Sequence, residues 1–140
     1  PDALKSNLFL RPAAVAHESG TFPLYLHENS QDDPIKWSTG SSLNSEKNNI
    51  KQDTFVNVNV IRLTEYIQKI DCQIQILKID IEGAEYPLLD DLIDTGLYKR
   101  VNRIYVETHA HKNPGLRDAD KNLRKKIKDL NIGNIYLDWI

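Results

Sequence analysis

One stretch, from Ile74 to Glu85, constrains the fold more than any other part of the sequence. It begins as an apolar run and ends with three acids within six positions, Asp80, Glu82 and the final glutamate. The apolar run predicts a strand buried on both faces, as in parallel sheets. Gly83 permits a tight turn, and helical periodicity follows it. The stretch therefore predicts a strand, a turn and a helix, with carboxylates at the strand end where α/β sheets bind ligands.

A second apolar strand is predicted after that helix, from Arg103 to His109, and it also ends in polar residues. A strand, a helix and a second strand form a β-α-β unit, whose two strands are often parallel neighbours. Neighbouring strands lie only about 4.8 Å apart. We therefore expect Asp80 and Glu82 to lie beside Glu107 and His109, and these four residues are the candidate catalytic residues.

Two kinds of chemistry suit such a cluster. A carboxylate or a histidine can act as a general base and take the proton of a substrate hydroxyl. Carboxylates with histidine also bind divalent metal ions, although the sequence does not identify which one. Without a function, Asp80 and Glu82 would stabilise the N-terminus of the following helix, and Glu107 would form an ion pair. We favour function for Asp80 and Glu107, a helix-start role for Glu85, and an exposed loop position for His111.

The first half of the chain predicts two strands and a long polar connection. Residues 8–10 and 13–16 predict a short buried strand, onto which residues 21–26 pair back as a hairpin. Residues 27–54 are polar, and a connection of this length is either a surface loop or a functional element. The simpler interpretation is a mobile loop. The more specific one is a lid formed by Trp37 and the serines that follow it.

The remaining elements are predicted from alternating or helical periodicity. They are a strand at residues 55–60, a short helix at residues 65–70 capped by Thr64, an amphipathic helix from Leu116 to Leu130 and a last strand from Ile135 to Ile140. The long helix carries six basic residues, which we interpret as a solvated face. A patch for anionic substrates or for a partner is the alternative.

Composition restricts the class of protein. With 140 residues, a formal charge of −2 and 40% hydrophobic residues, the chain suits one globular α/β domain. It has no apolar run near the roughly 20 residues of a membrane span, and no segment with the pattern of a signal peptide. The single cysteine, Cys72, excludes an internal disulfide and favours a cytoplasmic location. The near-neutral charge gives no indication of nucleic-acid binding.

Several segments resemble one known family. The segment Leu77–Glu85 resembles the signature of the FkbM-type S-adenosylmethionine-dependent methyltransferases, and Ile104–His109 resembles the strand that follows it there. Together with weaker likenesses upstream, the resemblance covers most of the chain. The weaker segments are residues 13–16, 19–20, 41–43 and 58–67.

The resemblance implies a Rossmann-like methyltransferase sheet and methylation of a hydroxyl on a sugar or another small molecule, with S-adenosylmethionine as the donor. By the same resemblance, Asp80 and Glu82 lie beside the donor methyl group and the acceptor hydroxyl. Glu107 and His109 face this acceptor, a small molecule or a glycan, from the next strand. The end of an earlier strand approaches the adenine, so the expected donor-binding residues are Ala14, Val15 and Asp80.

One part of the family pattern is missing. Methyltransferases of this kind open with a strand, a Gly-rich turn and a helix that bind the donor, yet no Gly-x-Gly occurs in this sequence. We therefore expect residues 1–140 to form a single incomplete domain, the C-terminal part of a longer methyltransferase, with its N-terminal strands absent. Such a chain would bind S-adenosylmethionine weakly, and its open sheet edges would favour self-association.

The main alternative is a non-catalytic, methyltransferase-like interaction module that retains the sheet without the donor site. The missing Gly-rich turn favours this module, whereas the complete acidic cluster favours the enzyme. A metal-dependent hydrolase is less favoured, because the sequence has no clear nucleophile elbow and no zinc-ligand spacing.

Overall fold

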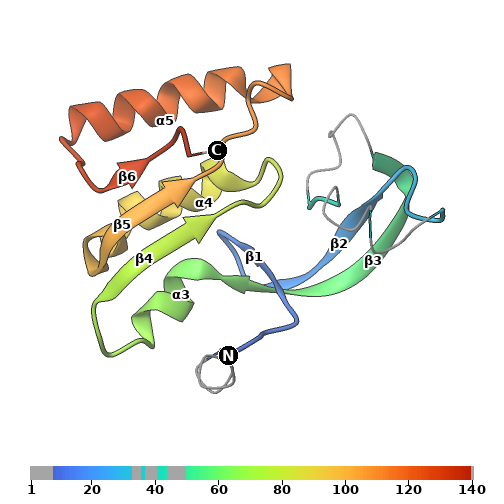
Figure 1. The fold of residues 1–140 in the computed structure, drawn as a ribbon, viewed down its shortest axis with the longest axis horizontal. Helices are drawn as coiled ribbons and strands as arrows, with labels where there is room; N and C mark the ends of the chain where they lie inside the picture. Colours follow the sequence, from blue (N-terminus) through green and yellow to red (C-terminus); the bar gives the residue numbers. More distant parts are fainter. Residues whose placement is uncertain (1–7, 33–35, 37–40, 44–49, 140) are drawn as a thin grey trace.

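The computed structural model describes residues 8–32, 36, 41–43 and 50–139. Within these residues the chain is mixed α/β and contains two small sheets (Figure 1). The strands are β1 (Ala14–Ala16), β2 (Gly20–His27), β3 (Ile50–Arg62), β4 (Ile74–Ile79), β5 (Val101–Val106) and β6 (Ile135–Tyr136). The helices are α3 (Leu63–Gln68), α4 (Glu85–Asp94) and α5 (Arg117–Asp129), with short 3-10 turns η2 (Leu97–Arg100) and η3 (Pro114–Leu116).

The C-terminal sheet has the strand order β4-β5-β6, and its described strand pairs are parallel. The pairing of β4 with β5 runs from Ile74 beside Val101 to Ile79 beside Val106, and α4 connects the two strands. The predicted β-α-β unit with neighbouring strands is therefore confirmed. As Figure 1 shows, the C-terminal ends of β4 and β5 lie side by side, so the loops that follow them meet at one sheet edge.

One face of this sheet is buried and the other is open. Leu77 and Ile79 of β4 share a face with Ile104 and Val106 of β5, and this face belongs to the core that α4 and α5 complete. On the opposite face Ile76 is 61% exposed. The prediction that this strand is buried on both faces is wrong, because both longer helices turn their buried side chains toward the same face.

The N-terminal sheet has the order β1-β3-β2. β2 pairs with β3 in antiparallel fashion, with Gly20 beside Val60, while β1 pairs with the other edge of β3 in parallel, with Ala14 also beside Val60. The predicted hairpin between the first two strands is therefore wrong. β3 is 13 residues long and lies between them, so each strand pairs with one of its edges instead.

Three boundaries in this region also differ from the predictions. Leu8, Phe9 and Leu10 are exposed and lie outside any strand, and Pro12, which has no N–H to donate to a strand ladder, separates them from β1. β3 begins at Ile50, so the predicted polar connection over residues 27–54 ends earlier than expected. Trp37 of the suggested lid lies outside the described residues.

Later boundaries differ by a few residues. α3 begins at Leu63 after an extended Arg62, so Thr64 lies inside the helix rather than at its N-cap. The hydroxyl of Thr64 donates a hydrogen bond to Asp91 of α4 instead. The predicted long helix is present as α5, and the last strand is shorter than predicted because β6 ends at Tyr136.

The main core lies entirely within residues 63–137 and joins the buried sheet face to the three helices. None of the described helices has the length and apolarity that crossing a membrane requires. The buried core side chains are Leu63, Ile67, Ile79, Tyr86, Leu88, Leu89, Leu92, Ile93, Val101, Ile104, Val106, Leu123, Ile132, Ile135 and Leu137.

Candidate active site

The turn between β4 and α4 forms the floor of the candidate site. Its backbone takes positive φ at two successive residues, 56° at Glu82 and 106° at Gly83. The second value is the conformation for which glycine is suited, as the sequence predicted. The first is unusual for a residue with a Cβ and costs free energy, a feature that concentrates at functional sites.

Glu85, the first residue of α4, holds this turn in place. Its carboxylate is fully buried and accepts hydrogen bonds from the backbone N–H of Gly83 at 3.0 Å and of Ile81 at 3.1 Å. The expected helix-start position is correct, but the side chain does more than favour the helix dipole. It satisfies two backbone donors that the turn would otherwise bury without partners.

The same carboxylate holds His109, which follows β5. Nδ1 of His109 lies 3.0 Å from Oε1 of Glu85, and the histidine side chain is only 4% exposed. The hydrogen bond to Glu85 raises the pKa of His109 above its ordinary value and outweighs the opposing effect of burial. Burial alone would raise the pKa of Glu85, but the bonds from His109 and Gly83 leave it lowered. The buried pair is thus stabilised in its charged form.

Tyr86, next to Glu85 in α4, supports the loop that carries His109. The Tyr86 hydroxyl accepts a hydrogen bond from the backbone N–H of Ala110 at 3.2 Å and donates one to Asp120 at 3.4 Å. Burial is the main reason that the pKa of Tyr86 rises to about 12, so the hydroxyl stays protonated. One turn of α4 therefore fixes both the loop after β4 and the loop after β5.

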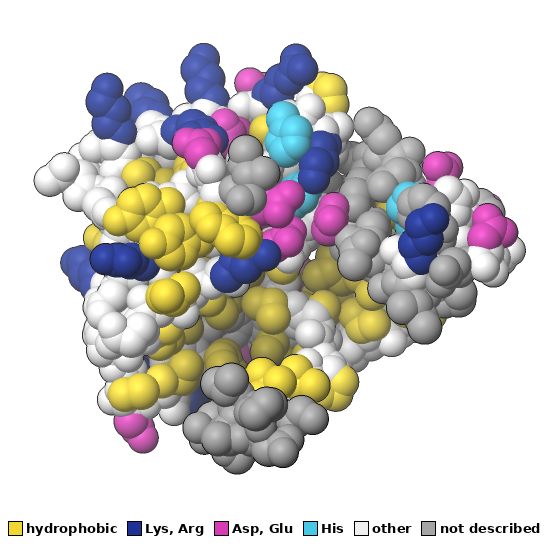
Figure 2. All heavy atoms as spheres, in the orientation of Figure 1, with side chains coloured by type: hydrophobic (Ala, Val, Ile, Leu, Met, Phe, Trp, Pro, Cys, Tyr) yellow, Lys and Arg dark blue, Asp and Glu magenta, His cyan; other side chains and the backbone are white. Residues whose placement is uncertain are grey.

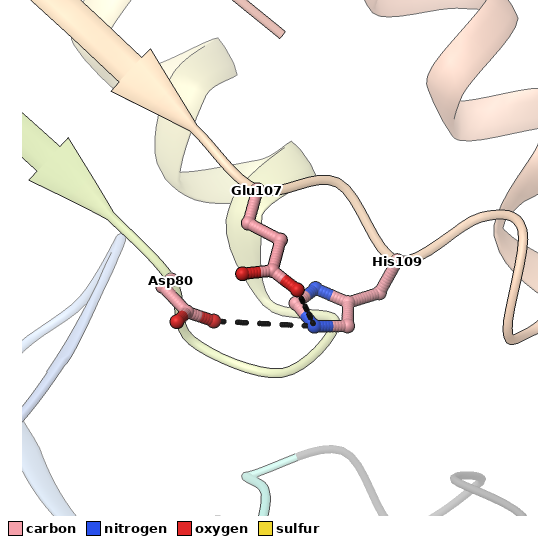
Figure 3. Close-up of side chains that lie close together, drawn as sticks. All are labelled: Asp80, Glu107 and His109. Carbon is pink, nitrogen blue, oxygen red and sulfur yellow. Dashed lines mark ion pairs between the residues drawn. The ribbon is translucent and has the colours of Figure 1, made fainter. Parts of the chain in front are cut away.

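Three carboxylates surround the other ring nitrogen of His109. Nε2 lies 3.6 Å from Oε2 of Glu82, 3.8 Å from Oε1 of Glu107 and 3.9 Å from Oδ1 of Asp80. Figure 3 shows the last two approaching the imidazole from the ends of their two strands. The structure thus brings together all four predicted catalytic residues, at distances longer than a hydrogen bond.

Two lysines balance part of this negative charge. Lys78 Nζ lies 3.6 Å from Oδ2 of Asp80, and Lys112 Nζ lies 3.3 Å from Oε1 of Glu107. The ion pair that we considered for Glu107 is therefore present alongside the cluster. Both lysine side chains are about half exposed, at 49% and 55%, so solvent screens them strongly. In Figure 2 acidic and histidine side chains gather near the centre of the face, with basic side chains beside them.

A cavity of about 290 Å³ opens on the Asp80 side of the cluster, between β1 and the turn after β4. Ala14 and Val15 line it together with Asp80 and Glu82, so the expected donor-binding residues share one cavity. Ser42 also lines it, and the hydroxyl of this buried serine donates a 3.0 Å hydrogen bond to the backbone oxygen of Glu82.

A second cavity, of about 310 Å³, opens on the Glu107 side. Lys112 and the exposed His111 line it, as does Trp139, whose ring lies 4.3 Å from Nζ of Lys78. The cluster therefore separates two concave spaces that are reached from different elements. The exposed position predicted for His111 is confirmed.

Sequence reasoning missed the role of two residues. Glu85 was expected to act only at the helix start, although its position two residues after the turn glycine placed its carboxylate within reach of the turn's N–H groups. Trp139 gave no signal, because it follows a short strand and reaches the site only through the pairing of β5 with β6.

The sequence belongs to a known family. The family model for the methyltransferase FkbM domain matches residues 1–131, which is most of the chain. Neither the comparison with curated proteins nor the comparison with solved structures gave a match. The chain is therefore a member of the FkbM methyltransferase domain family, as the resemblance of Leu77–Glu85 indicated.

Proposed function

We propose that this FkbM-family methyltransferase transfers a methyl group from S-adenosylmethionine to a hydroxyl of a sugar or another small molecule. Membership of the family supports methyl transfer. The observation that carries the rest is the position of His109 and its three carboxylates between two cavities. A donor and an acceptor that enter from opposite sides would meet at this cluster.

The donor side would be the cavity lined by Ala14, Val15 and Asp80. Its apolar wall suits a flat adenine, and its carboxylate suits a positively charged sulfonium. When bound, S-adenosylmethionine supplies an electrophilic methyl group on that sulfonium. The Gly-rich turn of such enzymes does not occur in this sequence, so we propose that residues 1–140 form an incomplete domain that contributes only one side of the donor site.

The acceptor side would be the cavity beside Glu107, where Trp139 offers a flat apolar surface for a sugar ring. Asp80 would position the acceptor hydroxyl, and Glu107, or His109 when its ring is neutral, would take the proton as the oxygen bonds to the methyl carbon and the bond from this carbon to the donor sulfur breaks. A positioned base contributes about 10²–10⁴-fold to the rate. Alignment of the two reactants contributes up to about 7–11 kcal/mol, which makes the fixed geometry of this edge the larger factor.

Isosteric variants test this assignment. Asp80→Asn and Glu107→Gln keep the side-chain shapes but remove the charges, so each should lower methyl transfer by about 100-fold or more while the fold is retained. Because we propose that residues 1–140 contribute only one side of the donor site and are inactive alone, the assay uses the protein with its complete donor site, excess radiolabelled donor and a panel of hydroxylated acceptors, with circular dichroism as the check on folding. Asp129→Asn, an exposed carboxylate on α5, is the matched control. Wild-type rates in both site variants would refute the assignment.

A second candidate function is a non-catalytic interaction module, which the absence of a Gly-rich turn favours. Calorimetric titration with S-adenosylmethionine tests both candidate functions, the methyltransferase and the non-catalytic module. We expect weak binding to the 140-residue chain, and micromolar affinity would contradict the proposal that the donor site is incomplete. Methyl transfer to any acceptor would exclude the module.

We place the protein in the cytoplasm, where the exposed thiol of Cys72 stays reduced, and propose that it self-associates through the edges of its sheets.

A further inference from the structure

Nε2 of His109 has no hydrogen-bond partner among the described residues, although the atom is buried. Buried polar atoms in proteins are almost always paired, so an exception calls for a physical explanation. This nitrogen points toward Asp80, Glu82 and Glu107, but their oxygens all remain 3.6–3.9 Å away. The nitrogen therefore lies at ion-pair distance from three carboxylates but beyond hydrogen-bond distance from these oxygens.

Glu85 determines which way the imidazole points. Because its carboxylate pairs with Nδ1, the neutral ring keeps its proton on Nδ1, and Nε2 binds a ligand once the imidazolium has released its second proton. Glu85 is itself fixed by the N–H groups of Ile81 and Gly83, so the ring has little freedom to turn. A histidine whose second nitrogen is held by a carboxylate is the usual arrangement of a histidine that binds a metal ion.

The spacing of the cluster fits a cation better than it fits direct hydrogen bonds. One ligand atom each from Asp80, Glu107 and His109 can be chosen so that all three lie within 4.8 Å of one another. Ligands about 2.1 Å from an octahedral ion lie about 3.0 Å apart when adjacent and about 4.2 Å apart when opposite. The separations of 3.8 and 3.9 Å from Nε2 fall inside this range.

We propose that Asp80, Glu107 and Nε2 of His109 bind one divalent cation of the Mn²⁺ class (Figure 3). Two carboxylates and one imidazole form a hard-to-borderline set, which suits Mn²⁺ better than a soft, thiolate-seeking ion. Glu82 adds a third negative charge at 3.6 Å from the same nitrogen. A divalent ion at this point would give the buried nitrogen its missing partner and neutralise the clustered carboxylates.

Lys78 and Lys112 each form an ion pair with a carboxylate of the cluster, so their ammonium groups would compete with the cation for these carboxylates. Lys112 contacts Oε1 of Glu107, the oxygen that also faces His109, and it must move aside when the ion binds. Because its side chain is 55% exposed, this displacement costs little. The inference rests on the geometry of the cluster and not on the proposed methyl transfer. With the ion bound, Nε2 of His109 cannot take a proton, so Glu107 would be the base of the proposed reaction through its second carboxylate oxygen.

Electron paramagnetic resonance with Mn²⁺ alone tests the site without any activity assay. Free Mn²⁺ gives a six-line signal that falls as the ion binds protein. Titration of the metal-stripped chain should show one bound ion per chain. Asp80→Asn and Glu107→Gln should each weaken binding by about 10-fold or more. Lys112→Gln should tighten it by about two- to fivefold, because a competing charge is removed.

A control variant shows whether the loss of the Mn²⁺ signal reports binding at this cluster. Asp129→Asn, which removes an exposed carboxylate on α5, should bind Mn²⁺ as the wild type does. His109→Gln should abolish binding, and if that buried substitution unfolds the chain, the partly exposed Asp80 still decides the question. An unchanged Mn²⁺ signal with wild-type protein would overturn the proposal. Equal binding by the Asp80 and Asp129 variants would also overturn it, since the ion would then bind elsewhere.

Discussion

The packed region, residues 63–139, and the ribbon region, the described part of residues 8–62, are built differently. Among the described residues, nearly all buried hydrophobic side chains lie in the packed region, and only Ala16 and Val60 lie in the ribbon region. In the ribbon region Phe55 and Val56 are about half exposed, and β2 and β3 extend away as a curved pair (Figure 1). The packed region thus fixes the candidate catalytic side chains, while the ribbon region only closes one wall of a cavity.

The two regions meet at a small polar contact. Nε of Arg62, at the end of β3, donates a 3.0 Å hydrogen bond to Asp91 of α4, and Thr64 donates to the same carboxylate at 2.7 Å. At the site itself, the hydroxyl of Ser42 donates to the backbone oxygen of Glu82. The ribbon region is therefore held by a few directional bonds together with Val15, which packs against the main core, and its position depends on these contacts.

The largest contrast is expected from one pair of leucine truncations. Leu89→Ala removes a fully buried side chain from α4 and should lower the free energy of unfolding by about 2–5 kcal/mol. Leu10→Ala makes the same chemical change where the side chain is 83% exposed, and should change it by no more than about 0.5 kcal/mol. Urea denaturation followed by circular dichroism measures both. Similar losses in the two variants would mean that the ribbon region has a core of its own.

A smaller effect is expected at the contact between the regions. The hydrogen bond from Arg62 holds the pKa of Asp91 below its ordinary value. The folded protein therefore gains stability from the ionised carboxylate above about pH 4, and loses it as the pH falls through the lowered pKa. Asp91→Asn should lower the free energy of unfolding at pH 7 by about 1 kcal/mol, since Arg62 is partly exposed.

The pH dependence separates this electrostatic contribution from a simple packing loss. In acid the wild-type carboxylate is protonated, so the gap between wild type and Asp91→Asn should narrow as the pH falls from 7 toward 3. Urea titrations across this range measure the gap directly. A gap that is constant with pH would show that Asp91 acts by its shape alone, and that the two regions are not joined electrostatically.

The difference between the regions also decided what the sequence could predict. The strand, turn and helix around Gly83 follow from local periodicity, and the meeting of Asp80 with Glu107 follows from the neighbour rule for β-α-β units. Both features belong to the packed region and are now observed. Their catalytic roles remain predictions.

What could not be predicted depends on distant partners. The placement of β3 between β1 and β2 is a matter of long-range pairing, on which a local hairpin pattern carries no information. Exposure of Ile76 depends on which face the helices cover. The role of Glu85 required a histidine 24 residues away, so a helix-start pattern could not reveal it.

The smallest expected effect compares two strained positions. Asn131 has φ of 51° after α5, where its N–H and that of Ile132 donate to Lys128 and Ile127 in a helix-ending motif that favours glycine. Glu82 has nearly the same φ, 56°, at the site. Replacement of either residue by glycine should raise the free energy of unfolding by about 0.5 kcal/mol, because the strain is relieved.

These two variants should differ in methyl transfer, although their free energies of unfolding should change by the same amount. Asn131→Gly should keep wild-type methyl transfer, because it lies outside the cluster. Glu82→Gly should lose most of it, since a carboxylate 3.6 Å from Nε2 of His109 is removed. Urea denaturation and the methyl-transfer assay on the same preparations measure both properties. If both variants were equally active, the strain at Glu82 would be a property of the fold alone, and its carboxylate would have no part in the reaction.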